Sequence, residues 1–202
     1  SGEQRLLGLF SRETMPVRLR GEAGRGAESP RPWLLGRLQP HLGEVTLPPP
    51  MACEPHPAFA GVPTLRQMTE AALAHLARGG ERGFFLMVES ASIDKEAHER
   101  RPCCSIGEMA QLEEALASAL AFADNHPRTR ILVTSVHAPA AQLLPRESLY
   151  ATYPGAPYTP GRLARLTTPE GALLVVNYAT SKFIKDEHTG AGVPLFANGE
   201  GL

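Results

Sequence analysis

Short apolar runs alternate with longer stretches of helical periodicity over the second two thirds of the chain. Residues 84–88 (FFLMV), 130–134 (RILVT) and 172–178 (ALLVVNY) are rich in β-branched and aromatic residues and predict buried strands. Between the first two runs, apolar residues recur at helical spacing and predict a helix over about 106–123. This alternation of strand and helix is typical of a parallel sheet in an α/β fold.

Two capping-box motifs predict where the helices begin. Thr64 with Gln67, and Ser105 with Glu108, each place a hydroxyl three residues before a Glu or Gln side chain that can reach back to the backbone. We therefore expect one helix that starts after Thr64 and ends at the glycine pair 79–80, and a second that starts after Ser105.

The two ends of the chain contain less regular patterns. Leu6–Phe10 predicts a further buried strand, whereas residues 15–63 are dense in Pro, Gly and Arg and predict a long irregular connection. We expect a βαβ core over 64–178, interrupted by a surface excursion at 153–160, and a last segment over 179–202. Because the first strand and the final turn-forming residues have few neighbours in sequence, we expect the chain to be part of a longer domain.

Composition and charge restrict the classes of partner. The chain has 202 residues, of which 43% are hydrophobic, so it can form one sizeable core. The formal net charge is −1 and the basic residues are scattered, which predicts no nucleic-acid surface. No apolar run approaches the roughly 20 residues that cross a bilayer, so we expect no membrane span.

Potential metal ligands follow each of the three predicted strands. Glu89 ends the first strand, and Asp94 and His98 follow at an i, i+4 interval that places a carboxylate and an imidazole on one face of a helix. His137 follows the second strand and His188 the third. An Asp and a His four apart are most often a solvated helix face, and each of these histidines could be structural, but strand ends converge in α/β sheets. The other histidines lack an acidic partner in register, and we expect no functional role for them: His41, His56, His75 and His126.

The sequence around these ligands resembles a known family. FFLMVESASIDKEAH at 84–98, ILVTSVHA at 131–138 and EHTG at 187–190 are similar to segments of the alkaline phosphatases, particularly the bacterial periplasmic type. The segments LLGLF, MPVR, VPTLRQMT and PCCSIGEM match in the same order, so the resemblance covers most of the chain. It implies a three-layer α/β/α domain with a mostly parallel sheet, of which this chain would be the C-terminal part.

The resemblance implies hydrolysis of phosphate monoesters by zinc and magnesium ions through a phosphoserine intermediate. Asp94, His98 and His188 match the ligands of one catalytic zinc, and His137 matches a ligand of the second. At Val136 the family has an aspartate ligand, and valine cannot ligate a metal. The resemblance therefore leaves open a degenerate relative that binds a metal or phosphate without catalysis. A phosphodiesterase or sulfatase of the wider superfamily is also possible, although the order of the motifs argues against it.

The remaining positions carried over from the resemblance concern magnesium and phosphate. Glu89 matches a carboxylate of the magnesium site, and Lys95 matches a residue that contacts phosphate through water. The nucleophilic serine and the arginine that holds the phosphate would belong to the part of such an enzyme outside this chain. We therefore expect the chain alone to be inactive, and the complete enzyme to be a homodimer.

Cysteine usage has two interpretations. Cys53 and Cys103 match a disulfide pair of the periplasmic enzymes, which implies a periplasmic or secreted protein and leaves Cys104 unpaired. The alternative is a Cys and His metal site, for which the adjacent pair Cys103 and Cys104 has an unfavourable spacing.

Overall fold

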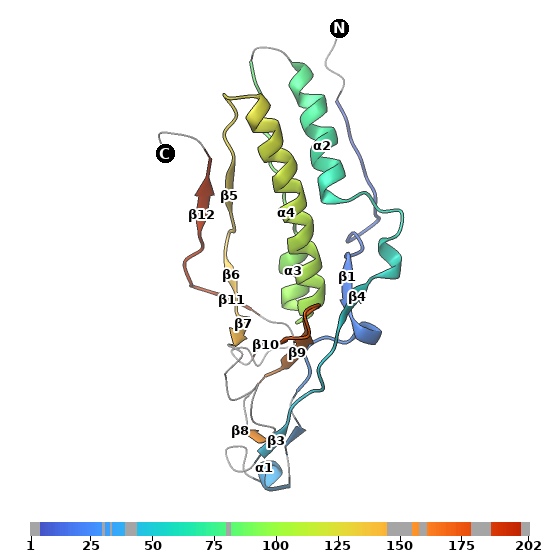
Figure 1. The fold of residues 1–202 in the computed structure, drawn as a ribbon, viewed down its shortest axis with the longest axis vertical. Helices are drawn as coiled ribbons and strands as arrows, with labels where there is room; N and C mark the ends of the chain where they lie inside the picture. The colour runs from blue at the N-terminus through green and yellow to red at the C-terminus, as the bar shows by residue number, and fades with distance from the viewer. Residues whose placement is uncertain are drawn as a thin grey trace.

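The computed structural model describes residues 5–29, 31–32, 34–38, 44–79, 82–144, 155–157, 161–178 and 187–198. Its helices, of which η denotes short 3-10 helices, are η1 (Glu22–Gly24), α1 (Leu34–Leu38), η2 (Pro57–Phe59), α2 (Leu65–Leu76), η3 (Ala77–Gly79), α3 (Ser92–His98) and α4 (Pro102–Asn125). Its strands are β1 (Leu19–Gly21), β2 (Arg31–Pro32), β3 (Glu44–Thr46), β4 (Cys53–Pro55), β5 (Leu132–Thr134), β6 (Ala138–Pro139), β7 (Gln142–Leu144), β8 (Gly155–Pro157), β9 (Leu163–Thr167), β10 (Leu173–Asn177), β11 (His188–Thr189) and β12 (Leu195–Ala197). In Figure 1, α4 lies between α2 on one side and β5, β6 and β12 on the other.

Helix α2 begins where the sequence predicts. The Thr64 hydroxyl accepts a hydrogen bond from the Gln67 amide at 3.1 Å, and the Gln67 side chain accepts one from the Thr64 amide at 2.9 Å. This reciprocal pair satisfies two backbone donors of the first turn, and it confirms the predicted capping box. Thr69 and Leu73 are buried on the face of α2 that packs against α4.

Helix α4 begins earlier than predicted. It starts at Pro102, whose ring fixes the backbone in a helical geometry at the first position, where no amide hydrogen is needed. The Ser105 hydroxyl donates to the Ile93 carbonyl at 3.3 Å, and the Glu108 carboxylate accepts from the Arg18 amide at 2.9 Å. The capping box predicted at Ser105 is therefore wrong, because both side chains make tertiary contacts within an established helix.

Two predicted buried strands are not formed. Leu6–Phe10 and Phe84–Val88 are without strand assignment, and their apolar side chains are largely exposed. Phe85 and Met87 are 89% and 76% exposed. A buried strand needs neighbours on both edges, and within the described part of the chain no strand pairs with either run. The prediction that these two runs are buried strands, which was based on hydrophobicity alone, is therefore wrong for this chain.

The strands form small antiparallel sheets. The predicted strands at 130–134 and 172–178 are present as β5 and β10, each shorter than expected. β10 is partly to fully buried, whereas Leu132 and Thr134 of β5 are exposed, so the predicted burial is wrong for β5. The sheets are ordered β7-β10-β9, β2-β3-β8, β1-β4, β11-β6 and β12-β5, and every strand pair among the described residues is antiparallel. A mostly parallel three-layer sheet is thus not found in this part of the molecule. β9 and β10 are joined by a tight turn at Gly171, which has φ +80°, and so short a loop permits only an antiparallel pair.

The predicted surface excursion at 153–160 lies outside the described residues except for β8, which pairs with β3. In the predicted irregular region 15–63, the described elements are no longer than five residues.

The main core lies where β9 and β10 meet the start of α4. Its buried side chains are Ala27, Met51, Cys103, Ala164, Leu166, Val176 and Tyr178. A disulfide between Cys53 of β4 and Cys103 of α4 joins the irregular N-terminal region to this core, as the resemblance implied. None of the described helices is both long and apolar enough to cross a membrane.

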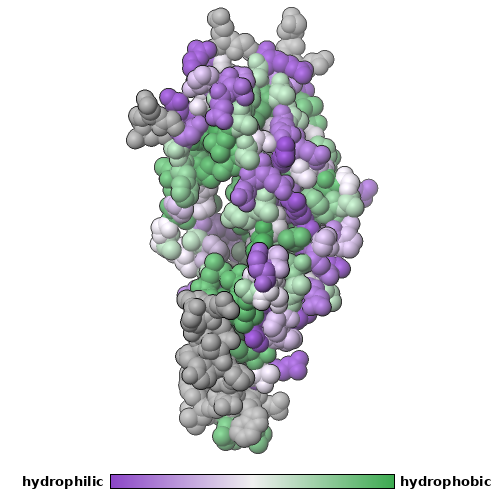
Figure 2. All heavy atoms as spheres, in the orientation of Figure 1, coloured by the Kyte–Doolittle hydropathy of each residue, from purple (hydrophilic) through white to green (hydrophobic). Residues whose placement is uncertain are grey.

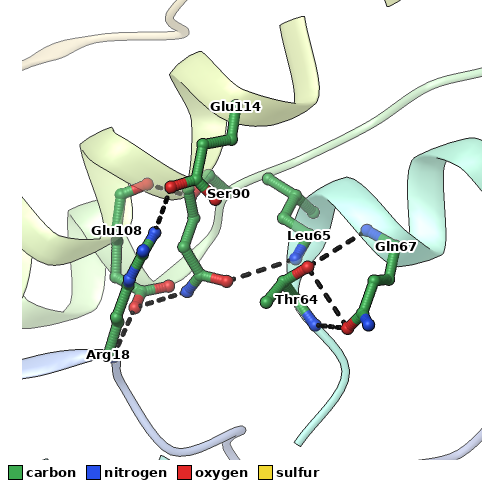
Figure 3. Close-up of polar contacts among 8 residues, drawn as sticks. Arg18, Thr64, Leu65, Gln67, Ser90, Glu108 and Glu114 are labelled. Atoms are coloured by element: carbon green, nitrogen blue, oxygen red, sulfur yellow. Dashed lines mark hydrogen bonds and ion pairs between the residues drawn. The ribbon is translucent and has the colours of Figure 1, made fainter. Parts of the chain in front are cut away.

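A polar network connects β1, α2 and α4 (Figure 3). The buried Glu108 carboxylate accepts hydrogen bonds from the Arg18 amide and from the Gln111 side chain, both at 2.9 Å. Gln111 in turn accepts from the Leu65 amide at 3.2 Å, and the Ser90 hydroxyl donates to the Glu108 carbonyl at 3.2 Å. The network thereby fixes α4 against the loop that leads into α3.

Candidate metal centre

Helix α3 places Asp94 and His98 on one face. They are four residues apart, and the Asp94 Oδ1 atom lies 3.4 Å from His98 Nε2. The helix is anchored to α4 by the bond from Ser105 to the Ile93 carbonyl. The short sequence of α3 therefore holds its shape through packing against α4 rather than through its own length.

The antiparallel pair β6 and β11 brings two distant histidines to the same place. His188 is the first residue of β11 and pairs with Pro139, and His137 directly precedes β6. The Ala140 amide donates to the Glu187 carbonyl at 2.9 Å, which extends the pairing. Strand pairing thus sets His137 and His188 side by side next to α3.

A single carboxylate oxygen faces all three imidazoles. Asp94 Oδ1 lies 3.4 Å from the Nε2 atoms of His98, His137 and His188 alike. The Nε2 atoms of His98 and His188 are 3.0 Å apart, and potential ligand atoms of Asp94, His137 and His188 all lie within 4.8 Å of one another. The four side chains are partly exposed, so a cation can reach them.

The imidazole rings differ in how they converge. The rings of His98 and His188 are tilted by 43° with centroids 4.8 Å apart, so their close nitrogens can aim at one point. The rings of His137 and His188 are stacked, with centroids 3.4 Å apart and planes 20° apart. Asp94, His137 and His188 form a group that could hold a metal ion, and His98 lies as close to the Asp94 carboxylate as the other two imidazoles. The geometry therefore brings all four side chains together without dividing them between two ions.

The spacing of the donor atoms fits zinc. Ligand atoms at about 2.0–2.1 Å from a tetrahedral zinc ion are about 3.3 Å from one another, close to the observed separations from Asp94 Oδ1. A carboxylate with neutral imidazoles is also a donor set that zinc accepts. One feature fits less well: His137 Nδ1 is buried without a hydrogen-bond partner, whereas a ligating imidazole usually donates from its other nitrogen.

Two predicted site residues are not among the side chains that the structure brings together here. Glu89 and Lys95 are exposed, and within the described part of the chain no hydrogen bond or ion pair links either side chain to Asp94, His98, His137 or His188. Val136, next to His137, is exposed and apolar and offers no ligand atom. The spacing of Asp94 and His98 in the sequence predicts that they lie together. The sequence does not predict that His137 faces the same carboxylate oxygen, because that contact depends on the pairing of β6 with β11.

The geometry does not favour the alternative Cys and His site. Cys103 is bonded to Cys53, and Cys104 is buried. Burial, followed by the nearby Glu96 carboxylate, raises the pKa of the Cys104 thiol to about 12. A metal ligand must be a thiolate, so Cys104 is poorly suited to this role.

Comparison with known proteins places these observations in a family. The sequence model described as alkaline phosphatase matches residues 1–193. The chain is 38% identical over 198 residues to alkaline phosphatase H of Pseudomonas aeruginosa, covering 98% of this chain and 36% of that protein. It is 39% identical over 197 residues to the alkaline phosphatase of Escherichia coli, with coverage of 96% and 36%.

A third relative carries a more specific name. The chain is 42% identical over 147 residues to streptomycin-6-phosphate phosphatase of Streptomyces griseus, which covers 69% of this chain and 31% of that protein. The chain thus spans about a third of the length of these curated relatives. With a family model that matches almost all of its residues and relatives aligned over nearly its whole length, the chain belongs to the alkaline phosphatase family.

Proposed function

We propose that this chain provides the main metal-binding part of an enzyme that hydrolyses phosphate monoesters. The observation that carries the proposal is the convergence of Asp94, His98, His137 and His188 in a chain of the alkaline phosphatase family. The relatives are named as phosphatases, which supports a phosphate ester as the substrate class.

The side chains divide between two ions in this proposal. Asp94, His98 and His188 hold one zinc, because the His98 and His188 nitrogens converge beside the Asp94 carboxylate. His137 contributes to a second zinc, as the resemblance to the family implies, and its ring is stacked on His188. Two such ions stabilise the charge on the entering and leaving oxygens of a phosphoryl group.

The other assignments rest on the family resemblance. Glu89 belongs to a magnesium site and Lys95 contacts phosphate through water. The nucleophilic serine, which forms a phosphoserine intermediate, comes from the part of such an enzyme that this chain does not match. That part also supplies the strands of a mostly parallel three-layer sheet. The disulfide between Cys53 and Cys103 supports a periplasmic or secreted location, and the family suggests a homodimer.

Metal binding by the chain tests the site directly. Co²⁺ added to the metal-free protein should give the visible absorption of a tetrahedral site, and Zn²⁺ should displace it. His188→Ala should abolish this spectrum. His126→Ala is the matched control, because His126 lies at the far end of α4 and should leave the spectrum unchanged. An unchanged spectrum in His188→Ala would refute the ligand assignment.

Activity is tested in a protein that joins this chain to the matching remainder of an alkaline phosphatase. With zinc and magnesium added, it should release p-nitrophenol from p-nitrophenyl phosphate. Val136→Asp should raise that rate, because a carboxylate beside His137 adds a ligand to the second position.

Val136 also favours a second candidate function. An exposed valine beside His137 leaves the second position with one ligand from this chain, as in a relative that binds a metal or phosphate without turnover. Co²⁺ binding without p-nitrophenol release, in both the original protein and Val136→Asp, would favour this binding function over catalysis.

A further inference from the structure

Glu96 is a charged residue on the buried face of α3. Figure 2 shows many hydrophilic residues on the surface of the molecule, whereas Glu96 is only 8% exposed. Asp94 and His98, two residues before and two residues after it, are partly exposed. Two positions correspond to about 200° around an α-helix, so Glu96 lies on the side of α3 opposite to both candidate ligands.

The Glu96 side chain faces the start of α4. Its Oε2 atom lies 3.5 Å from Nη1 of Arg101, the residue that precedes α4, and the Arg101 amide donates to the Glu96 carbonyl at 2.9 Å. The buried thiol of Cys104, in the first turn of α4, also lies beside this carboxylate. The side chain and the backbone of Glu96 therefore both connect α3 to the beginning of α4.

Burial of the Glu96 carboxylate costs free energy. Its Oε2 atom is buried and makes no hydrogen bond within the described part of the chain. An apolar residue of similar size is often as stable as an incompletely paired charge at such a position. Overall stability therefore does not account for a carboxylate here. What the carboxylate adds to apolar packing is a contact with a preferred direction, toward the Arg101 guanidinium.

Few other contacts fix the rotation of α3 about its axis. The helix has seven residues, and Ala91 before it provides no side-chain cap. The Ser105 hydroxyl donates to the Ile93 carbonyl in the first turn, and the Ala27 amide donates to the Arg100 carbonyl at 2.8 Å after the helix has ended. A rotation of about 20° would move a ligand atom that is about 5–6 Å from the axis by about 2 Å, which is the length of a zinc–nitrogen bond.

We infer that Glu96 is a positioning residue of the metal centre. Its contacts with Arg101 and Cys104 fix the rotation of α3 about its axis. This rotation sets the direction in which Asp94 and His98 present their ligand atoms to an ion. The inference rests on the proposed function, because it requires these side chains to hold a metal, but it does not require phosphate hydrolysis.

Co²⁺ binding to the metal-free full chain tests this role. Glu96→Ala should raise the Kd for Co²⁺ about tenfold and shift the visible absorption, because misdirected ligands distort the tetrahedral site. Glu96→Gln keeps the length and the polar oxygen of the side chain, so its Kd should lie within about threefold of the original value. Hydrogen exchange of the α3 amides in the metal-free protein should be faster in Glu96→Ala, because the helix is less constrained.

Two further variants separate positioning from stability. Leu73 is buried on α2, which lies beside the upper part of α4 in Figure 1, whereas α3 lies beside the lower part. Leu73→Ala should lower the urea midpoint at least as much as Glu96→Ala, yet leave the Kd for Co²⁺ within about twofold of the original. Arg101→Met keeps the aliphatic stem and removes the charge that faces Glu96, so it should weaken Co²⁺ binding in the same direction as Glu96→Ala. Circular dichroism verifies that each variant folds.

Three results would overturn the inference. The first is an unchanged Kd in Glu96→Ala while His188→Ala still abolishes the spectrum; if Glu96→Ala does not fold, Arg101→Met decides by the same criterion. The second is an equal loss of affinity in Leu73→Ala, which would make the effect one of stability alone. Both of these results leave the proposed function intact. The third is an original chain that binds no Co²⁺, which would refute the ligand assignment as well.

Discussion

The Glu108 carboxylate should be a principal source of stability, because it is a buried acceptor that joins α4 to the residue before β1 and holds Gln111, which in turn accepts from the start of α2. It is 7% exposed and accepts hydrogen bonds from the Arg18 amide and the Gln111 side chain (Figure 3). Replacement by alanine leaves two donors without a partner in a buried site. Each such donor costs about 1–3 kcal/mol, and alanine returns a few tenths through helix propensity, so we expect a loss of about 2–5 kcal/mol.

The free energy of unfolding is measured by urea denaturation followed by circular dichroism, for the original protein and each variant. Glu113→Ala is the matched control, since Glu113 is an exposed glutamate on the same helix and its loss should change stability by about 0.5 kcal/mol or less. In a chain of this length, the Glu108→Ala effect corresponds to a fall in Tm of about 4–20 °C.

Glu108→Gln separates hydrogen bonding from charge. The amide oxygen of glutamine can still accept from the Arg18 amide, so this variant should lie between the original and Glu108→Ala. If Glu108→Ala were as stable as Glu113→Ala, the network in Figure 3 would contribute little and the reasoning would be refuted.

Three further predictions follow from other parts of the fold. The disulfide between Cys53 and Cys103 closes a loop with a sequence separation of 50. Its reduction should lower the free energy of unfolding by about 4 kcal/mol, as measured by urea denaturation. An unchanged denaturation midpoint would contradict this prediction. The pKa of Cys104 is raised from 9.0 to about 12 in the folded state. The contribution of this thiol to the free energy of unfolding should therefore be constant below about pH 9 and fall as pH rises toward 12, because the unfolded thiol ionises first; a Cys104→Ala variant should lack this fall. Iodoacetamide at pH 8 should accordingly label Cys104 far more slowly in the folded than in the unfolded protein. Gly107→Ala would place a Cβ atom 2.9 Å from the backbone nitrogen of Leu19 and should lower the free energy of unfolding by about 1–3 kcal/mol in urea denaturation. A variant as stable as the original protein would contradict this prediction.

Local signals in the sequence predicted the start of α2 correctly. The Thr64 capping box marks that start, whereas the α-helix ends at Leu76 and a short 3-10 helix continues to Gly79, so the α-helical part ends before the glycine pair that was predicted to terminate it. The same motif at Ser105 was misleading, since a proline three residues earlier had already started the helix and the serine had a tertiary partner. A capping motif therefore predicts a helix more reliably than its first residue.

The candidate site was predictable in its members and less so in its arrangement. The i, i+4 spacing predicted the pair Asp94 and His98, and the expected convergence of strand ends predicted that His137 and His188 lie nearby. Their meeting depends on pairing between β6 and β11 and on the contacts of α3 with α4, which involve residues far apart in sequence. The stacking of His137 on His188 could not be read from either residue alone.

The segment 84–88 shows that an apolar run predicts a preference for burial but not whether the side chains are buried in the structure. Burial of its apolar side chains is favourable wherever another apolar surface can pack against them. The sequence of the run shows this preference, but it does not show which residues would pack against the run. Phe84 finds Phe122 within this chain, whereas Phe85 and Met87, on the opposite face, do not find an equivalent partner among the described residues. The prediction of a buried strand is therefore wrong, although the ring contact with Phe122 shows that α4 covers one side chain of the run. Glu89 follows this segment directly and is itself exposed, so a predicted magnesium ligand stands at the end of a run that no strand pairing among the described residues holds in place.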